Sequence, residues 1–268
     1  TGIEKLPQNE LNKIDHLIAV MSGKGGVGKS SVAALLGVKL AREGYKVGLL
    51  DADITGPSIP KMFGIRSRAE AFEFGILPVR TALGIEVMSL NLLLDHEDDP
   101  VIWRGPLIAG TVRQFWTDVI WGELDYLIVD LPPGTGDAPL TVMQSLPLNG
   151  LVIVSSPQDL AVMVVKKAIK MASIMKVPVL GLLENMSYAI YPECGKPLRL
   201  FGPPKGEEVA KATGIPYLGA LPLDPKLAAL CDSGQIEVYS NPTVENSIDW
   251  EAMLKTGIAN SSPLTQVF

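Results

Sequence analysis

The chain has 268 residues, of which 47% are hydrophobic and 19% are charged. A chain of this length and composition buries roughly three quarters of its unfolded surface, which excludes an intrinsically disordered protein. The 23 basic and 29 acidic residues leave a net charge of −6, without the concentrated positive field that nucleic-acid binding usually requires. Two cysteines, Cys194 and Cys231, are too few for a disulfide framework and fit a reducing compartment.

Targeting and membrane signals are also lacking in the sequence. No apolar run reaches the ~18 residues of a membrane span, and the first ten residues lack the apolar segment of a signal peptide. We therefore expect a soluble cytoplasmic protein that binds neither membranes nor nucleic acid. No linker composition divides the chain, so we expect one domain over residues 1–268.

Short apolar runs alternate with stretches of helical periodicity along the chain. This alternation predicts an α/β fold, a mostly parallel sheet flanked by helices. The spacing of Val32, Leu36 and Leu40, with Gly44 as a stop, predicts a helix over 29–42. Residues 62–94 interrupt the alternation and are interpreted as an inserted hairpin, with possible strands at 76–79 and 85–90. The expected buried strands are Leu17–Met21, Val47–Leu50, Tyr126–Val129, Leu151–Val154, Val179–Leu183 and Tyr217–Leu221.

A glycine-rich segment directly follows the first expected strand and matches the P-loop pattern G-x-x-x-x-G-K-[ST] in its strand-loop-helix setting. Backbone N–H groups of such a loop, together with the positive helix end, cradle nucleotide phosphates. We expect Lys29 to neutralise the β and γ oxygens and Ser30 to ligate Mg²⁺ through its hydroxyl. Lys24 is a second cation, and its alternative is a solvated loop lysine. The expected nucleotide contacts are Gly23, Lys24, Gly25, Gly26, Val27, Gly28, Lys29, Ser30 and Ser31.

Carboxylates follow two of the other expected strands, at the sheet edge where α/β proteins bind ligands. Asp51 is expected to hold Mg²⁺ or its waters, and Asp53 to orient or deprotonate the attacking water. Turn-forming aspartates that bind local backbone remain the alternative for both. Asp130 matches a Walker B carboxylate and is expected to bind Mg²⁺ through water, whereas Asp137 is expected to cap a helix that starts near Pro139.

The loop resembles that of the deviant-Walker-A ATPases, the group that includes MinD, ParA and the nitrogenase iron protein, because Lys24 precedes the two glycines. More narrowly, the chain is similar to the Mrp (ApbC) family of ATP-dependent iron–sulfur cluster carriers. This resemblance implies a homodimer in which Lys24 of one subunit reaches the phosphates of the other and Asn185 contacts the adenine. The segments that carry it are Trp103–Pro106, Trp121–Tyr126, Asp130–Asp137, Glu184–Tyr188 and Leu221–Pro225.

One departure from this family concerns the cluster ligands. Family members carry C-x-x-C shortly after the segment that begins at Glu184, so that two subunits supply four thiolates to one bridging cluster. Here Tyr191 replaces the first cysteine and Cys194 is the second, which leaves two thiolates per subunit pair. Cys194 is either a metal or redox ligand or an inert relic. Cys231 either contributes to the cluster or is a small buried hydrophobe.

We therefore expect a slow ATPase that carries or assembles an iron–sulfur cluster and acts on apo iron–sulfur proteins or assembly factors. The alternatives are a MinD- or ParA-like positioning ATPase and an ATP-dependent scaffold without a cluster. The acidic balance and the absence of a terminal basic amphipathic helix disfavour the positioning ATPase. Lys166, Lys167 and Lys170 form a basic helix face that either meets an acidic partner or is merely solvated.

Overall fold

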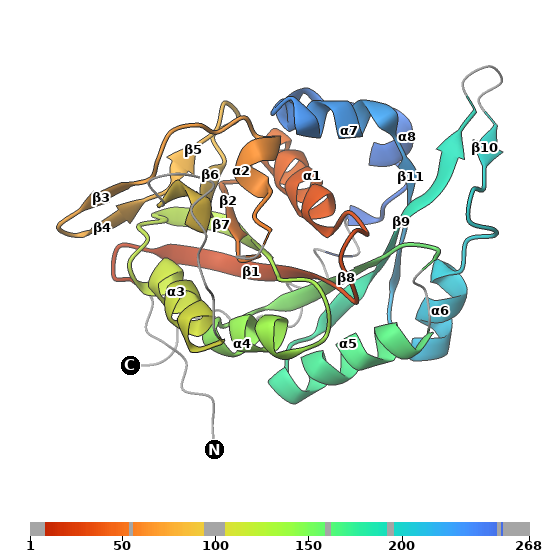
Figure 1. Cartoon of the computed structure of the whole chain (residues 1–268), viewed down its shortest axis with the longest axis horizontal. Helices are drawn as coiled ribbons and strands as arrows, with labels where there is room; N and C mark the ends of the chain where they lie inside the picture. The colour runs from red at the N-terminus through yellow and green to blue at the C-terminus, as the bar shows by residue number, and fades with distance from the viewer. Residues whose placement is uncertain are drawn as a thin grey trace.

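The computed structural model describes residues 9–53, 56–93, 105–158, 162–191, 196–250 and 253, without the side chains of 105–109. Its main sheet has nine described strands in the order β10-β9-β8-β1-β7-β2-β6-β5, with β11 paired to β9. β5 and β10 are antiparallel to their neighbours, and the other pairings are parallel (Figure 1). The strands are β1 Lys13–Ser22, β2 Val47–Asp51, β5 Val79–Arg80, β6 Glu86–Ser89, β7 Glu123–Asp130, β8 Gly150–Ser155, β9 Val179–Ile190, β10 Pro197–Leu198 and β11 Tyr217–Leu223.

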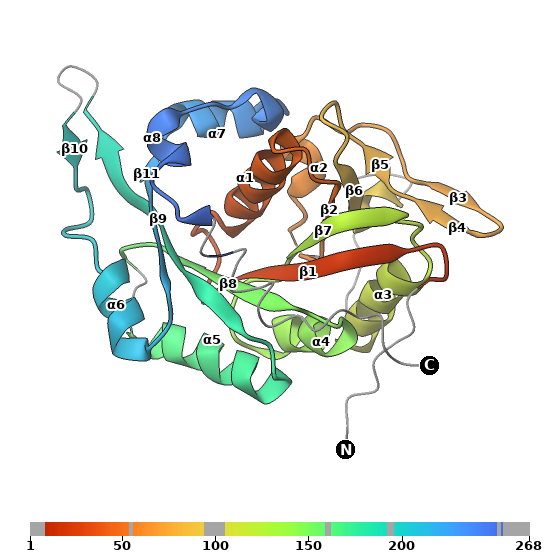
Figure 2. The ribbon, with the colours of Figure 1, turned by 180° about the vertical axis from the view of Figure 1, so that it is seen from behind.

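Helices cover both faces of this sheet, as Figures 1 and 2 show. One layer contains α1 Lys29–Arg42, α2 Ile59–Met62, α7 Pro225–Asp232 and α8 Pro242–Glu245. The other layer contains α3 Gly105–Thr117, α4 Asp137–Ser145, α5 Val162–Met175 and α6 Gly206–Thr213. Two short 3-10 turns lie at Leu90–Leu92 and Ile236–Val238.

The apolar residues of β1 contribute to two hydrophobic cores, one on each face of the sheet. Leu17, Ala19 and Met21 pack with α3, α4 and α5, whereas Ile18 and Val20 pack with α1. Successive strand residues point to opposite faces, so a strand that is covered on both sides must be apolar throughout. The predicted α/β fold with a mostly parallel sheet is confirmed.

The segment interpreted as an inserted hairpin divides into two parts. β3 Glu70–Phe72 and β4 Gly75–Leu77 form a separate antiparallel hairpin. β6, in contrast, is a strand of the main sheet and pairs in parallel with β2. The end of β6 therefore lies beside Asp51 and helps to form the edge on which the predicted site lies.

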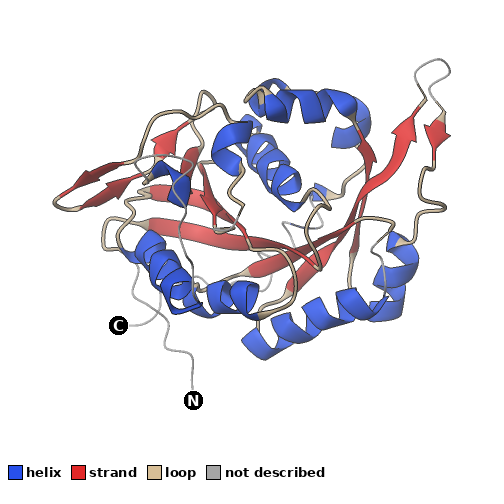
Figure 3. Ribbon diagram, viewed as in Figure 1, coloured by secondary structure: helices blue, strands red, loops and turns tan. Residues whose placement is uncertain are grey.

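Two predicted boundaries differ from the structure. α4 begins at Asp137 with Gly136 as its N-cap and has no side-chain cap, so the predicted capping role of Asp137 is wrong. The carboxylate instead lies in the first helical turn, where it faces the positive end of the helix dipole. β9 runs seven residues past its predicted end at Leu183, and Figure 3 shows its far end forming an arm with β10.

Candidate functional site

The predicted P-loop lies between β1 and α1, at the carboxyl edge of the central parallel strands. Its final glycine, Gly28, is the N-cap of α1 in a left-handed conformation with φ 74°, and Gly26 has φ 80°. Only glycine adopts such φ values without steric cost. No side chain caps α1 and its first turn has no acidic residue, so its positive end remains open to an anion.

Two neighbouring elements approach this loop so closely that they leave no room for a side chain. A Cβ atom on Gly28 would overlap the Asn185 amide, and one on Gly23 would overlap Val164 of α5. Asn185 is buried, and its Nδ2 donates a 2.9 Å hydrogen bond to the Val27 carbonyl. The structure therefore brings Asn185 to the loop, while its predicted contact with adenine stays a prediction.

Lys29, Ser30 and Asp130 meet at the start of α1. The Lys29 Nζ lies 2.6 Å from Oδ1 of Asp130, and the Ser30 hydroxyl donates to Oδ2 of the same carboxylate. Lys29 is 5% exposed and Asp130 is 1% exposed. Burial raises the pKa of Asp130, and the Lys29 ammonium opposes this rise. The Ser30 and Asp130 oxygens are the donor types that Mg²⁺ prefers, so the residues present fit that ion.

Asp51 has a different set of partners from the one predicted. Its Oδ2 accepts backbone hydrogen bonds from Ser58 (2.8 Å) and Ile59 (3.0 Å), and its Oδ1 accepts one from Asp53 (3.2 Å). Burial, followed by repulsion from Asp130, raises the pKa of Asp51 to about 7. These contacts favour the alternative interpretation of Asp51 as a residue that fixes the local backbone.

The two remaining charged candidates differ in exposure. Asp53 is 8% exposed, and its Oδ2 lies 4.0 Å from Lys29 Nζ, which places it at the same centre as Asp130. Lys24 is exposed, and its carbonyl accepts a hydrogen bond from the Ser22 hydroxyl.

The arm formed by β9 and β10 carries the predicted cluster position. The Tyr191 N–H donates to the Lys196 carbonyl (2.9 Å), whereas Cys194 lies outside the described residues. Among the residues that are described, no group of three His, Cys, Asp or Glu side chains could hold a metal ion. Exposed apolar side chains lie at the end of β9, on β10 and just after it: Ile190, Tyr191, Leu198, Leu200 and Phe201.

Cys231 lies in the core beside α1 and not on the surface. It is 9% exposed, and burial raises the pKa of its thiol although the side chain of Ser31 opposes this rise through a hydrogen bond. A buried neutral thiol is a poor metal ligand, because metals bind the thiolate. The structure thus favours the interpretation of Cys231 as a small buried hydrophobe.

Glu184 is a structural residue of the site to which the sequence analysis assigned no role. Its carboxylate is fully buried and accepts backbone hydrogen bonds from Lys205 and Gly206, both 3.2 Å. These hydrogen bonds connect β9 to the start of α6. Glu184 directly precedes Asn185 in the chain. A charged residue inside an apolar strand was the signal that could have identified it, because such a residue requires buried partners.

Among the described helices, none combines the length and the apolar character that crossing a membrane requires.

Comparisons with known proteins agree with this geometry. The family model of the ParA class described as NUBPL iron-transfer P-loop NTPase matches residues 13–256. An iron-sulfur cluster carrier protein of Clostridium perfringens is 50% identical over 84% of this chain and 82% of its own length. A carrier protein of the same description from Methanocaldococcus jannaschii is 49% identical over 86% of this chain and 80% of its own length.

Solved structures show the same relationship. A nucleotide-binding protein from Archaeoglobus fulgidus in complex with ADP is 50% identical, with a TM-score of 0.79 over 89% of this chain and 91% of its own. The MinD cell division protein of Aquifex aeolicus is 22% identical, with a TM-score of 0.58 over 93% of this chain and 100% of its own, and shows a shared fold. This chain belongs to the NUBPL iron-transfer family of ParA-class P-loop NTPases, which are nucleotide-binding proteins.

Proposed function

We propose that this chain is an ATP-hydrolysing iron–sulfur cluster carrier that works as a nucleotide-gated homodimer. The observation that carries the nucleotide part is the convergence of Lys29 and Ser30 on Asp130 beside the open end of α1. The loop backbone and Lys29 hold the phosphates of ATP, and Ser30 and Asp130 hold Mg²⁺. When bound, Mg²⁺ neutralises negative charge on the β- and γ-phosphate oxygens.

Asp53 and Lys24 have separate roles in this proposal. Asp53 faces the same centre as Lys29 and orients the attacking water through its carboxylate. Lys24 is exposed and reaches the phosphates of the partner subunit, so the closed dimer requires a nucleotide in the site. Asp51 supports the backbone between β2 and α2 and does not bind the metal directly.

The cargo of the dimer is an iron–sulfur cluster held at the arms. Each subunit supplies one thiolate, from Cys194, because Tyr191 replaces the other cysteine of the family. A stable cluster usually needs four thiolates, and Cys231 is buried beside α1. Small thiols or the recipient protein therefore supply the remaining ligands, which makes the cluster weakly held and suited to transfer.

The first experiment tests the nucleotide site. We expect Lys29→Ala to weaken Mg²⁺-dependent ATP binding by at least about tenfold, because the buried phosphate-directed ammonium is lost. Isothermal titration with ATP measures this effect, and Lys226→Ala, which removes an exposed lysine of α7, is the control. Equal affinities of Lys29→Ala and the wild-type protein would contradict the assigned site.

The second experiment tests the cargo by anaerobic reconstitution with iron and sulfide, followed by desalting and an iron count per dimer. We expect Tyr191→Cys to retain more iron than the wild-type protein, and Cys194→Ser to retain none. Tyr191→Phe is the matched control, since it alters the same side chain without adding a thiol. If wild type holds a full cluster as firmly as Tyr191→Cys does, the proposed effect of Tyr191 is wrong. If neither protein holds iron, the carrier function fails and an ATP-dependent scaffold takes its place.

A further inference from the structure

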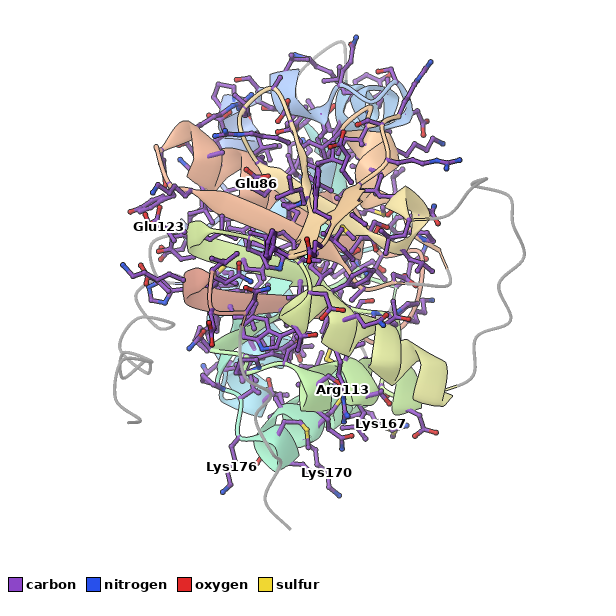
Figure 4. All side chains as sticks on the ribbon, turned by 90° about the vertical axis from the view of Figure 1, so that its left-hand side faces the viewer. Glu86, Arg113, Glu123, Lys167, Lys170 and Lys176 are labelled. Atoms are coloured by element: carbon purple, nitrogen blue, oxygen red, sulfur yellow. The ribbon has the colours of Figure 1, made fainter. Side chains whose placement is uncertain are left out.

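The exposed side of α5 combines positive charge with apolar contact area. Lys166, Lys167 and Lys170 are exposed on it between Met163 and Ile174, which are 68% and 61% exposed. We call these five residues the α5 face. In Figure 1, α5 lies along the lower side of the molecule. Lys167 and Lys170 are labelled on the same side in Figure 4.

Among the residues that the structure describes, no acidic side chain pairs with the lysines of the α5 face. The sequence of α5 contains no aspartate or glutamate. Within the described parts of the chain, these three lysines form no ion pair. In contrast, Lys39 pairs with Glu43 and Lys46 pairs with Glu123 elsewhere on the surface. A local cluster of unneutralised cations on a chain of net charge −6 produces a field that favours one orientation of an acidic molecule.

The first turn of α5 also contacts the nucleotide loop. Val164 occupies the space that a side chain on Gly23 would fill, and it is the residue that follows Met163 of the α5 face. If the backbone moves at Gly23 toward Val164, the first turn of α5 must move with it or oppose the movement, because packed contacts deform little. The contact between Val164 and Gly23 thus joins the α5 face to the P-loop.

We propose that the α5 face is the docking surface for an acidic protein partner, whose binding is coupled to the nucleotide in the P-loop through Val164. The partner presents carboxylates to the three lysines and apolar side chains to Met163 and Ile174. These two residues are eleven positions apart, about 16 Å along the helix, which matches roughly three turns of a partner helix. Apolar contacts combined with charge pairs are the usual composition of a specific protein interface.

Charge and patterning favour a protein over the other anionic partners. A membrane-surface helix presents a continuous apolar stripe to lipid, but the apolar stripe of α5 faces the core through Val165, Ala168, Met171 and Ala172. Duplex nucleic acid requires cations in larger number, on a surface whose overall field is positive. The inference goes beyond the proposed carrier function, because it requires neither iron nor Cys194.

A charge-reversal experiment tests the docking surface. The probe is a synthetic amphipathic helical peptide with glutamates around two leucines, and its binding is followed by fluorescence anisotropy. We expect the triple variant K166E, K167E, K170E to bind it at least about tenfold more weakly than wild type, because three charge pairs become repulsive. The matched control is K13E, K61E, K226E, which changes three exposed lysines outside α5, has the same net charge and should bind within about threefold of wild type.

Several results of this experiment would overturn the docking surface. It is wrong if wild type does not bind the peptide, or if both triple variants lose affinity equally. It is also wrong if wild type binds a 20-base-pair DNA duplex or phosphatidylglycerol vesicles in preference to the peptide, because the partner is then of another class. A change in the dimer content of the α5 triple variant, with unchanged peptide binding, would assign the face to contacts between two copies of this chain. The iron content and ATP turnover of that variant should equal those of wild type, which separates this test from the carrier function.

A second measurement tests the coupling to the nucleotide. We expect the affinity of wild type for the peptide to differ by about fivefold or more between ADP and a non-hydrolysable ATP analogue, which is the usual size of an allosteric coupling. Val164→Ala should reduce this ratio towards one, because it removes the contact with Gly23. Val162→Ala, in the same helical turn, is the matched control and should keep the ratio. Equal peptide affinities of wild type in the two nucleotides would overturn the coupling.

Discussion

Asp51 and Asp53 are two residues apart, yet their carboxylates face different partners. Asp51 accepts three backbone hydrogen bonds and fixes the segment that leads from β2 to α2. Asp53 instead lies near Lys29, with its carboxylate at the edge of the phosphate loop. Both residues lie at the carboxyl end of β2. The pattern D-x-D alone therefore does not distinguish an aspartate that fixes the backbone from one that takes part in catalysis.

A matched pair of substitutions tests this division of roles. We expect Asp51→Asn to lower the free energy of unfolding by about 1–3 kcal/mol, since the new amide group faces buried backbone donors. Asp53→Asn should slow ATP hydrolysis by about 100-fold, with nucleotide binding retained. Urea unfolding and single-turnover hydrolysis measure the two effects. Equal turnover of Asp53→Asn and wild type would transfer the water-orienting role to another residue.

β9 links the nucleotide loop to the arm within a single strand. Its residues up to Glu184 pair with β8, and the pairing with β11 extends to Ala189. Asn185 follows at the point where the pairing with β8 ends and binds Val27 of the P-loop, and Met186 has φ 56° in the left-handed region. Tyr191 lies six residues beyond Asn185, so only a short stretch of chain separates the contact with the loop from the end of β9.

A pair of glycine substitutions tests the contact between β9 and the loop. Gly26→Ala and Gly28→Ala both place a side chain in the left-handed region, which costs roughly 1–2 kcal/mol. Only the methyl group at residue 28 also meets Asn185, whereas a Cβ on Gly26 has open space around it. In urea unfolding without nucleotide, we expect Gly28→Ala to be less stable than Gly26→Ala by about 1–3 kcal/mol. Asn185→Ala should abolish this difference, and its persistence in that background would show that Asn185 is not the cause.

The predictability of these elements from sequence depended on where their partners lie. The bounds of α1 were predicted correctly, because the spacing of its apolar residues and Gly44 are local signals. The end of β9 was not, since Glu184 interrupts the apolar run and is stabilised by backbone groups at 205 and 206. The partners of Asp51 likewise lie at Ser58 and Ile59, beyond the reach of a strand-end pattern.

At the scale of the whole molecule, the nucleotide loop, the arm and the start of α5 depend on one edge of the sheet. The P-loop follows β1, the arm extends β9 past the end of β8, and α5 follows the carboxyl end of β8. Asn185 and Val164 connect the loop to the arm and to α5. One change in the loop can therefore reach both the proposed cargo position and the proposed docking surface, as the nucleotide gating that we propose requires.

Lys24 provides the test of whether a second copy of the chain completes this arrangement. We expect Lys24→Ala to bind ATP as a monomer but to form the ATP-dependent dimer at least about tenfold less well, because a charge-assisted contact with the partner's phosphates is lost. Sedimentation with a non-hydrolysable ATP analogue measures the dimer fraction, and Lys226→Ala is the control for loss of an exposed lysine. The proposed contact forms only in the closed dimer, so the variant should match wild type in ADP. A dimer fraction in the ATP analogue equal to that of wild type would show that Lys24 acts within its own subunit, and gating would then need another contact between subunits.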